Sequence, residues 1–418
     1  MGAGPGRFQF KANGTRFRIF AHSERLGFAD EVVCVDARPG SIAAGPTDDT
    51  IAVIDALGKP SYCSDTTGKL KKRPVPPYPA DGPRSRTPAA PVRGHFAHIR
   101  PGRRAFSAAM AFAVVRITVE VWQHFFQRPI AWHFAATAGP VLQVHPRIGT
   151  RNAWSGDGYL EFGYPDWDWT MGNPFSENLE VIAHETGHLV MKGVLGTLPD
   201  DERTLQHRAH EESAADLIAL VVAMQFESVI AHVLRATSGY LYESSLLSRI
   251  GEWGHGQADV ERNAFNEATM ASARADPKLN KHKLSSPFTG AVYDLLVEIF
   301  VGHLARAGAI SRPLADDCRH EPGRPTADLS AAFARAIRGR QAVFAEALRQ
   351  ARDDLGALLA GAWLATGGGN ISFGRVLAGL IESDRALGLG HAAFIREVFA
   401  ARGIAPAPAD AAARRAGR

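Results

Sequence analysis

Two short segments, both rich in metal-binding side chains, constrain this chain more than any other feature. The pentapeptide His184–His188 reads His-Glu-Thr-Gly-His, and the pentapeptide Glu212–Asp216 begins 24 positions after His188. Residues four apart on a helix share one face, so the two histidines form one pair and the two carboxylates another. A catalytic zinc site takes three nitrogen, sulfur or carboxylate ligands and leaves its fourth position to water. The sequence therefore predicts one Zn²⁺ per chain, held by His184, His188 and Glu212.

The residues beside these ligands predict the rest of the site. Both segments are embedded in apolar runs, where polar side chains need partners. Glu185 would lie beside the water on the metal and act as the general base. Asp216 could accept the free ring N–H of a ligand histidine and fix the orientation of that ring. The alternatives are a polar helix face without a metal and, for Glu212 and Asp216, acidic residues that stabilise the start of a helix.

With these residues in place, the chain resembles the gluzincins, the thermolysin-like clan of zinc metallopeptidases. Val181–His188 resembles the zinc helix of that clan, and Glu212 and Asp216 match its third ligand and its carboxylate behind the ligands. Asn152 and Ala153, followed by Trp, resemble the start of its edge strand. The resemblance implies that this strand binds the backbone of an extended substrate peptide by β-augmentation.

The sequence also departs from the clan in ways that keep other interpretations open. The spacing between His188 and Glu212 is a few residues longer than expected, and the extra length lies in the polar loop 197–202. No Tyr occurs between the two ligands, where thermolysin-like enzymes carry one. A metzincin is excluded because position 194 is Val194 and not His. The Gly-x-Met-Glu-Asn motif of aminopeptidases is also missing, which favours an endopeptidase.

The resemblance further implies a distant histidine that stabilises the oxyanion of the tetrahedral intermediate. His282, in the segment 281–294, is the best match, and Tyr293 is a second candidate. Such a donor acts mainly in the transition state. The segment is predicted to be a loop that leads into a helix capped by Ser286 or Thr289. The alternatives without a catalytic role are a solvated loop histidine for His282 and a core-facing tyrosine for Tyr293.

Composition limits the partners that the chain can have. The net charge is only +4 in 418 residues, and no basic stripe with interleaved aromatics is present, so nucleic acid is not expected. Three cysteines far apart form no disulfide framework. The start of the chain has no apolar signal segment, and the apolar run 106–126 contains Arg116 and Glu120, which favours a buried helix over a membrane span. We therefore expect a cytoplasmic protein without membrane contact, whose oligomeric state the sequence leaves open.

Alternation and helical periodicity outline the organisation of the chain. Alternating runs predict strands at 17–20, 31–35 and 130–134, and helical periodicity predicts helices at 106–126, 290–305 and 346–364. The glycine run 367–369 should separate two helices. The predicted regions are a strand-rich N-terminal region (1–69), a Pro-rich linker (70–94), a zincin catalytic region (95–225), a helical C-terminal lobe (226–404) and a disordered tail (405–418).

Together these features predict an α+β, zincin-like fold with a β-containing N-terminal lobe and a mainly helical C-terminal lobe. The predicted activity is zinc-dependent hydrolysis of peptide bonds in a peptide or protein substrate. One alternative is a non-hydrolytic zincin-fold protein with a structural zinc or a peptide-binding cleft. Another is an enzyme kept latent by its own N-terminal region, which deletion of residues 1–94 would activate.

Overall fold

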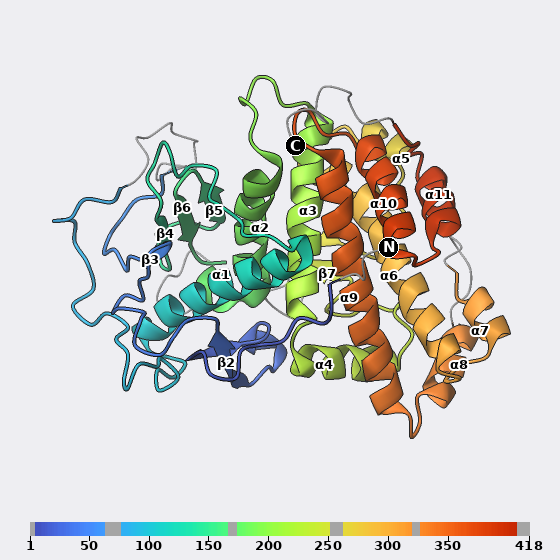
Figure 1. Ribbon diagram of the computed structural model, residues 1–418, viewed down its shortest axis with the longest axis horizontal. Coiled ribbons are helices and arrows are strands. Elements are labelled where there is room, and N and C mark those ends of the chain that lie inside the picture. The colour runs from blue at the N-terminus through green and yellow to red at the C-terminus, as the bar shows by residue number, and fades with distance from the viewer. Residues whose placement is uncertain (1–4, 63–76, 166–173, 251–261, 320–326, 408–418) are drawn as a thin grey trace.

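The fold is α+β, with small sheets in the N-terminal part and helices in the C-terminal part (Figure 1). The computed structural model describes residues 5–62, 77–165, 174–250, 262–319 and 327–407. Residues 70–76 of the predicted Pro-rich linker, and the predicted tail from residue 408, lie outside these ranges. The two helices that carry the predicted metal ligands lie between the sheet part and the helical part.

The N-terminal part contains a hairpin and a four-stranded sheet. Strands β1 (Thr15–Phe20) and β2 (Asp30–Val35) pair antiparallel, which confirms the predicted strands there. The sheet has the order β3-β4-β6-β5, formed by β3 (Ile51–Val53), β4 (Leu142–His145), β6 (Tyr159–Phe162) and β5 (Ala153–Gly156). The first three are parallel, and β5 runs antiparallel to β6. Because β5 stands at the end of this order, one of its edges has no neighbouring strand among the described residues.

The long apolar helix α1 (Arg104–Phe126) forms the core of the N-terminal part, as the sequence predicts. Phe17 of β1 stacks on Phe112 of α1 and on Phe96, with ring centroids 5.5 and 4.7 Å apart. Among the described helices, α1 and α6 (Lys281–Arg306) are long and apolar enough to cross a membrane. However, 83% and 78% of their most apolar windows are buried inside the protein. Their hydrophobic surface is therefore used for packing.

The helical part packs mainly on α3 (Leu205–Ala223), the second of the two ligand helices. Helices α2 (Leu179–Leu195) and α3 pack on each other, and α6 packs on both α3 and α9 (Gln341–Thr366). The break predicted at the glycine run is confirmed, because α9 ends at Thr366 and α10 begins at Phe373. The remaining elements are η1 (Glu24–Leu26), η2 (Phe175–Glu177), α4 (Glu227–Thr237), β7 (Arg249–Ile250), β8 (Arg262–Asn263), α5 (Met270–Ala275), α7 (Arg312–Asp317), α8 (Ala327–Ala336), α9 (Gln341–Thr366), α10 (Phe373–Leu387) and α11 (Ala392–Ala401).

Two predicted local structures are wrong. Residues 130–134 form no strand, because the chain turns at 133–138 and Trp132 and Phe134 stack on each other within the turn. Their alternate burial imitates the pattern of a strand. The helix predicted to follow a loop after His282 already begins at Lys281, where the Asn280 side chain accepts a hydrogen bond from the backbone N–H of Lys283. Neither Ser286 nor Thr289 caps it.

Candidate metal centre and its cleft

Helix α2 presents the two predicted histidine ligands on one side. Its start is fixed by Asn178, whose side chain accepts hydrogen bonds from the backbone N–H groups of Glu180 and Val181. The opposite side of the helix is fully buried, with Ile182 and Leu189 at 0% exposure. Burial of that side turns His184 and His188 toward the cleft.

Helix α3 brings the carboxylate ligand close because α2 has a glycine at the contact. A Cβ atom on Gly187 would lie 3.1 Å from both Cα of Ala215 and Cγ2 of Ile218. The missing side chain therefore lets the two helix backbones approach each other. As a result, Glu212, three residues before Ala215 on α3, reaches the two histidines of α2.

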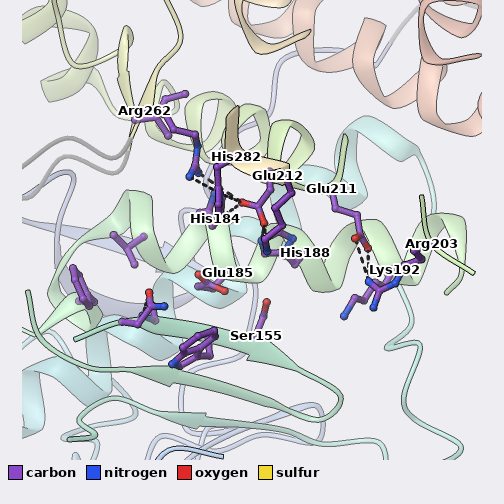
Figure 2. A pocket seen from close by; sticks show the side chains of 17 residues that line it. Ser155, His184, Glu185, His188, Lys192, Arg203, Glu211, Glu212, Arg262 and His282 are labelled. Carbon is purple, nitrogen blue, oxygen red and sulfur yellow. Dashed lines mark hydrogen bonds and ion pairs between the residues drawn. The ribbon is translucent and has the colours of Figure 1, made fainter. Parts of the chain in front are cut away.

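The three predicted ligands converge (Figure 2). Nε2 of His184 lies 3.7 Å from Oε2 of Glu212, and Nε2 of His188 lies 3.8 Å from Oε1 of Glu212. One donor atom from each residue lies within 4.8 Å of the other two, a group that could hold a metal ion. Glu212 is 2% exposed, and among the described residues its Oε2 receives no hydrogen bond of good geometry. Two imidazoles and one carboxylate form a donor set that suits zinc.

Asp216 lies directly behind the first histidine. Its Oδ1 is 2.9 Å from Nδ1 of His184, so the ring donates its Nδ1–H there and keeps Nε2 for a metal. Asp216 is 1% exposed, and Arg262 forms a bidentate ion pair with it. A buried carboxylate that holds a ligand ring in this way fixes the direction of the ligand nitrogen.

Three basic side chains surround Glu212 on the side of α6. The ammonium group of Lys281 lies 2.7 Å from Oε1 of Glu212, and Nδ1 of His282 lies 3.1 Å from Oε2. Arg262 reaches the same carboxylate at 3.9 Å. Of these three side chains, the sequence pattern predicts only His282 as a site residue. No motif marks Arg262, which comes from the two-residue strand β8, whereas Lys281 could have been noticed beside His282.

The electrostatics of the site follow from burial and from these neighbours. Burial alone would raise the pKa of Glu212, but His282, the two histidine ligands and Lys281 outweigh it and hold that pKa well below its usual value. Burial holds the pKa of His188 well below its usual value, so this ring is neutral, as a metal ligand must be. Burial opposes protonation of His184, but the Asp216 carboxylate more than offsets it and raises the pKa of that ring.

Glu185 is set apart from the ligands, on the side of the cleft that faces β5 (Figure 2). Burial raises the pKa of its carboxyl, and the charge of Glu212 adds to this effect, whereas His184 and a hydrogen bond from Ser155 oppose it. A raised pKa makes this carboxyl a stronger proton acceptor than an ordinary glutamate, which suits a general base.

The cleft holds a cavity of about 400 Å³ between β5, α2, α3 and the start of α6. Asn152 and Ala153 line it, and the Asn152 side chain accepts a hydrogen bond from the backbone N–H of Ala153. His282 also lines it. Tyr293 does not, because it is 1% exposed and donates its hydroxyl hydrogen bond to the carbonyl of Leu241 at 2.7 Å. The prediction of Tyr293 as an oxyanion donor is therefore wrong, and the core-facing alternative is right.

Comparison with known proteins gives a distant structural similarity. The chain resembles the precursor of protealysin, a metalloproteinase from Serratia proteamaculans, with 14% sequence identity and a TM-score of 0.46. The match covers 78% of this chain and 84% of that chain. No family model and no curated protein matches the sequence.

Proposed function

We propose that this protein is a zinc-dependent peptidase of the gluzincin type that cleaves peptide bonds within a chain. The observation that carries the proposal is the convergence of His184, His188 and Glu212 in a cleft that also contains Glu185 and the open strand β5. A structural zinc site has four protein ligands and no base, whereas this group has three ligands and a carboxyl beside them. This difference favours hydrolysis over the structural-zinc alternative.

In this proposal each group at the site has a separate role in hydrolysis. When bound by the three ligands, Zn²⁺ supplies a Lewis acid that polarises the scissile carbonyl and acidifies water. Glu185 takes a proton from the attacking water as the C–O bond forms, and gives a proton to the leaving nitrogen as the C–N bond breaks. His282, at the edge of the cavity, donates a hydrogen bond to the oxygen that becomes negative.

Strand β5 binds the substrate in this proposal. Its open edge offers backbone donors and acceptors to an extended peptide, and Asn152 and Ala153 align the segment next to the metal. Such binding depends on the peptide backbone and does not require a free terminus. We therefore expect cleavage of peptides whose two ends are blocked, which an exopeptidase would reject.

Substitution of the base separates catalysis from metal binding. We expect wild type and Glu185→Gln to contain about one zinc per chain by elemental analysis, and Glu212→Ala to lose most of it. We expect wild type to cleave end-blocked, internally quenched peptides, and Glu185→Gln to lose at least about a hundredfold in kcat. Zinc in wild type without cleavage of any peptide would favour a binding role, and full activity of Glu185→Gln would refute the proposed base.

A further inference from the structure

The cleft continues past His188 into a second cavity. The first cavity is lined at this end by Lys192, Arg203 and Glu211, and the same three residues line an adjoining cavity of about 550 Å³. Figure 2 shows Lys192 and Arg203 together at this end, beyond His188. Lys192 lies four residues after His188 on α2, so the two side chains share one face of the helix. The helix face that carries the histidine ligands therefore also carries the Lys192 ammonium.

The polar loop 197–202, which lengthens the spacing between the metal ligands, forms one wall of the second cavity. The loop residues that line it are Thr197, Leu198, Pro199 and Asp200. The end of the loop is held by Asn370, whose side chain donates to the carbonyl of Glu202 and accepts from the backbone N–H of Thr204 at 3.1 Å. The additional length between the ligands therefore builds part of the cleft.

Lys192 has the weakest compensation of the two cations at this end. Its ammonium carries three N–H donors, and among the described residues its ion-pair partner is Asp157, at 4.0 Å. The same oxygen of Asp157 lies closer to another group, 2.8 Å from Nε2 of His133. Arg203, in contrast, pairs with Glu211 at 3.2 Å. The Lys192 ammonium therefore has donors to offer to a bound molecule. Asp157 directly follows β5, so an extended peptide bound along that strand reaches Lys192 at this end.

The charges that are shielded from water at this end have a positive excess. The side chains of Lys192 and Arg203 are each 19% exposed, and only the carboxylate of Glu211, at 18%, opposes them at similar depth. The other carboxylates of this end, Asp157 and Asp200, are 63% and 81% exposed. Water and salt screen exposed charges strongly and partly buried charges much less. A negative group next to Lys192 is therefore favoured over a positive one.

We propose that Lys192 is a specificity-determining residue that binds an acidic side chain of the substrate on the His188 side of the metal site. The carboxylate of a substrate Glu or Asp accepts hydrogen bonds from the Lys192 ammonium. The proposal rests on the proposed peptidase function and adds a substrate class to it, namely peptides with an acidic residue near the cleaved bond. Because Lys192 lies on one side of the metal ligands, the preference applies to one side of that bond.

A scan with a single Glu along a neutral, end-blocked and internally quenched peptide tests the preference. We expect wild type to prefer Glu over Gln about tenfold in kcat/KM at one position, the scale of one charge-assisted hydrogen bond in a partly exposed site. The preference should decrease with added salt. Lys192→Met should lose it, and Lys192→Glu should prefer Lys at the same position.

A lysine elsewhere in the chain provides the matched control. Lys11 pairs with Asp36 at 3.7 Å and is not among the described residues that line the cavity. Lys11→Met removes the same charge from the protein and should keep the wild-type preference. Equal rates for Glu and Gln at every position in wild type would overturn the proposal, as would a Glu preference that persists in Lys192→Met.

Binding separates this proposal from the peptidase function. If wild type with zinc cleaves no peptide, the peptidase proposal fails, and fluorescence anisotropy of the same peptides, carrying a dye, tests the subsite. Wild type should then bind the best Glu peptide about tenfold more tightly than its Gln counterpart, and Lys192→Met should bind the two equally. Equal affinities in wild type would refute the role of Lys192 even in a protein that only binds peptides.

Discussion

We interpret Asp216 as a residue that stabilises the metal site without contacting the metal. Its carboxylate accepts the Nδ1–H of His184 and is itself held by Arg262. Removal of such a partner typically weakens metal binding 10- to 100-fold. We expect Asp216→Asn to weaken zinc affinity by about that factor in a competition with a chelator. Glu211→Gln is the control, because Glu211 lines the same cavity but pairs with Arg203. An equal loss there would contradict the specific role of Asp216.

A second residue-scale prediction concerns the buried histidine of β4. Burial, together with the nearby charge of Lys59, lowers the pKa of His145 to about 3, from a usual value of 6.5. At a pH between these two pKa values, His145 binds a proton in the unfolded chain but not in the folded protein. The corresponding stability is complete above about pH 6.5 and is lost as the pH falls toward 3, at up to about 1.4 kcal/mol per pH unit.

Urea unfolding at pH 7.5 and pH 5 measures this effect. We expect His145→Asn to lose less stability between the two pH values than wild type, because Asn can still donate to the carbonyl of Ile54 but does not titrate. The comparison uses the change with pH and not the absolute stability, which the substitution also alters. An identical pH dependence in the two proteins would show that His145 does not exclude a proton.

At the scale of elements, the approach of α2 and α3 determines whether the ligands meet. Ala at position 187 would place its Cβ 3.1 Å from the backbone of α3 and from Ile218. We expect Gly187→Ala to cost about 1–3 kcal/mol of unfolding free energy, as overpacked cores do, and to weaken zinc binding because Glu212 moves away.

A glycine on another helix provides the control for this prediction. Gly302 lies in α6, and a Cβ there would meet nothing within 4 Å. Gly302→Ala should therefore be neutral or stabilise the protein by about 0.5–1 kcal/mol. If chemical denaturation shows the same change for both variants, the close approach of the helices does not explain Gly187.

For the whole molecule, the packing of β1 favours a structural role for the N-terminal region over that of a removable inhibitor. Phe17 and Ile19 of β1 are 0% exposed, and Phe17 packs on α1. The described residues that line the cavity begin at Asn152. We expect deletion of residues 1–94 to abolish cooperative thermal unfolding in circular dichroism, because it exposes the apolar surface of α1. A folded deletion variant with increased peptidase activity would instead support the latent enzyme.

Local sequence predicts those helices and strands whose spacing of apolar and polar residues is set within the element itself. The i,i+4 pairs of α2 and α3 follow from helical periodicity, so their ligands could be recognised before the structure was known. The turn at 133–138 could not, because the alternate burial of Trp132 and Phe134, which stack on each other, resembles that of a strand. Likewise, Asn280 competes with Ser286 and Thr289 as a helix cap, and sequence alone does not rank them.

The sequence by itself determined the α+β class and the donor types of the site, because spacing on a helix fixes which side chains share a face. Only the tertiary structure decided which distant residues join them. Arg262 reaches Asp216, and Lys281 reaches Glu212, through the packing of α6 on α3 and of β8 on α6. Tyr293 turns into the core for the same reason. Contacts between elements depend on the packing of many buried side chains, and no short pattern encodes such packing.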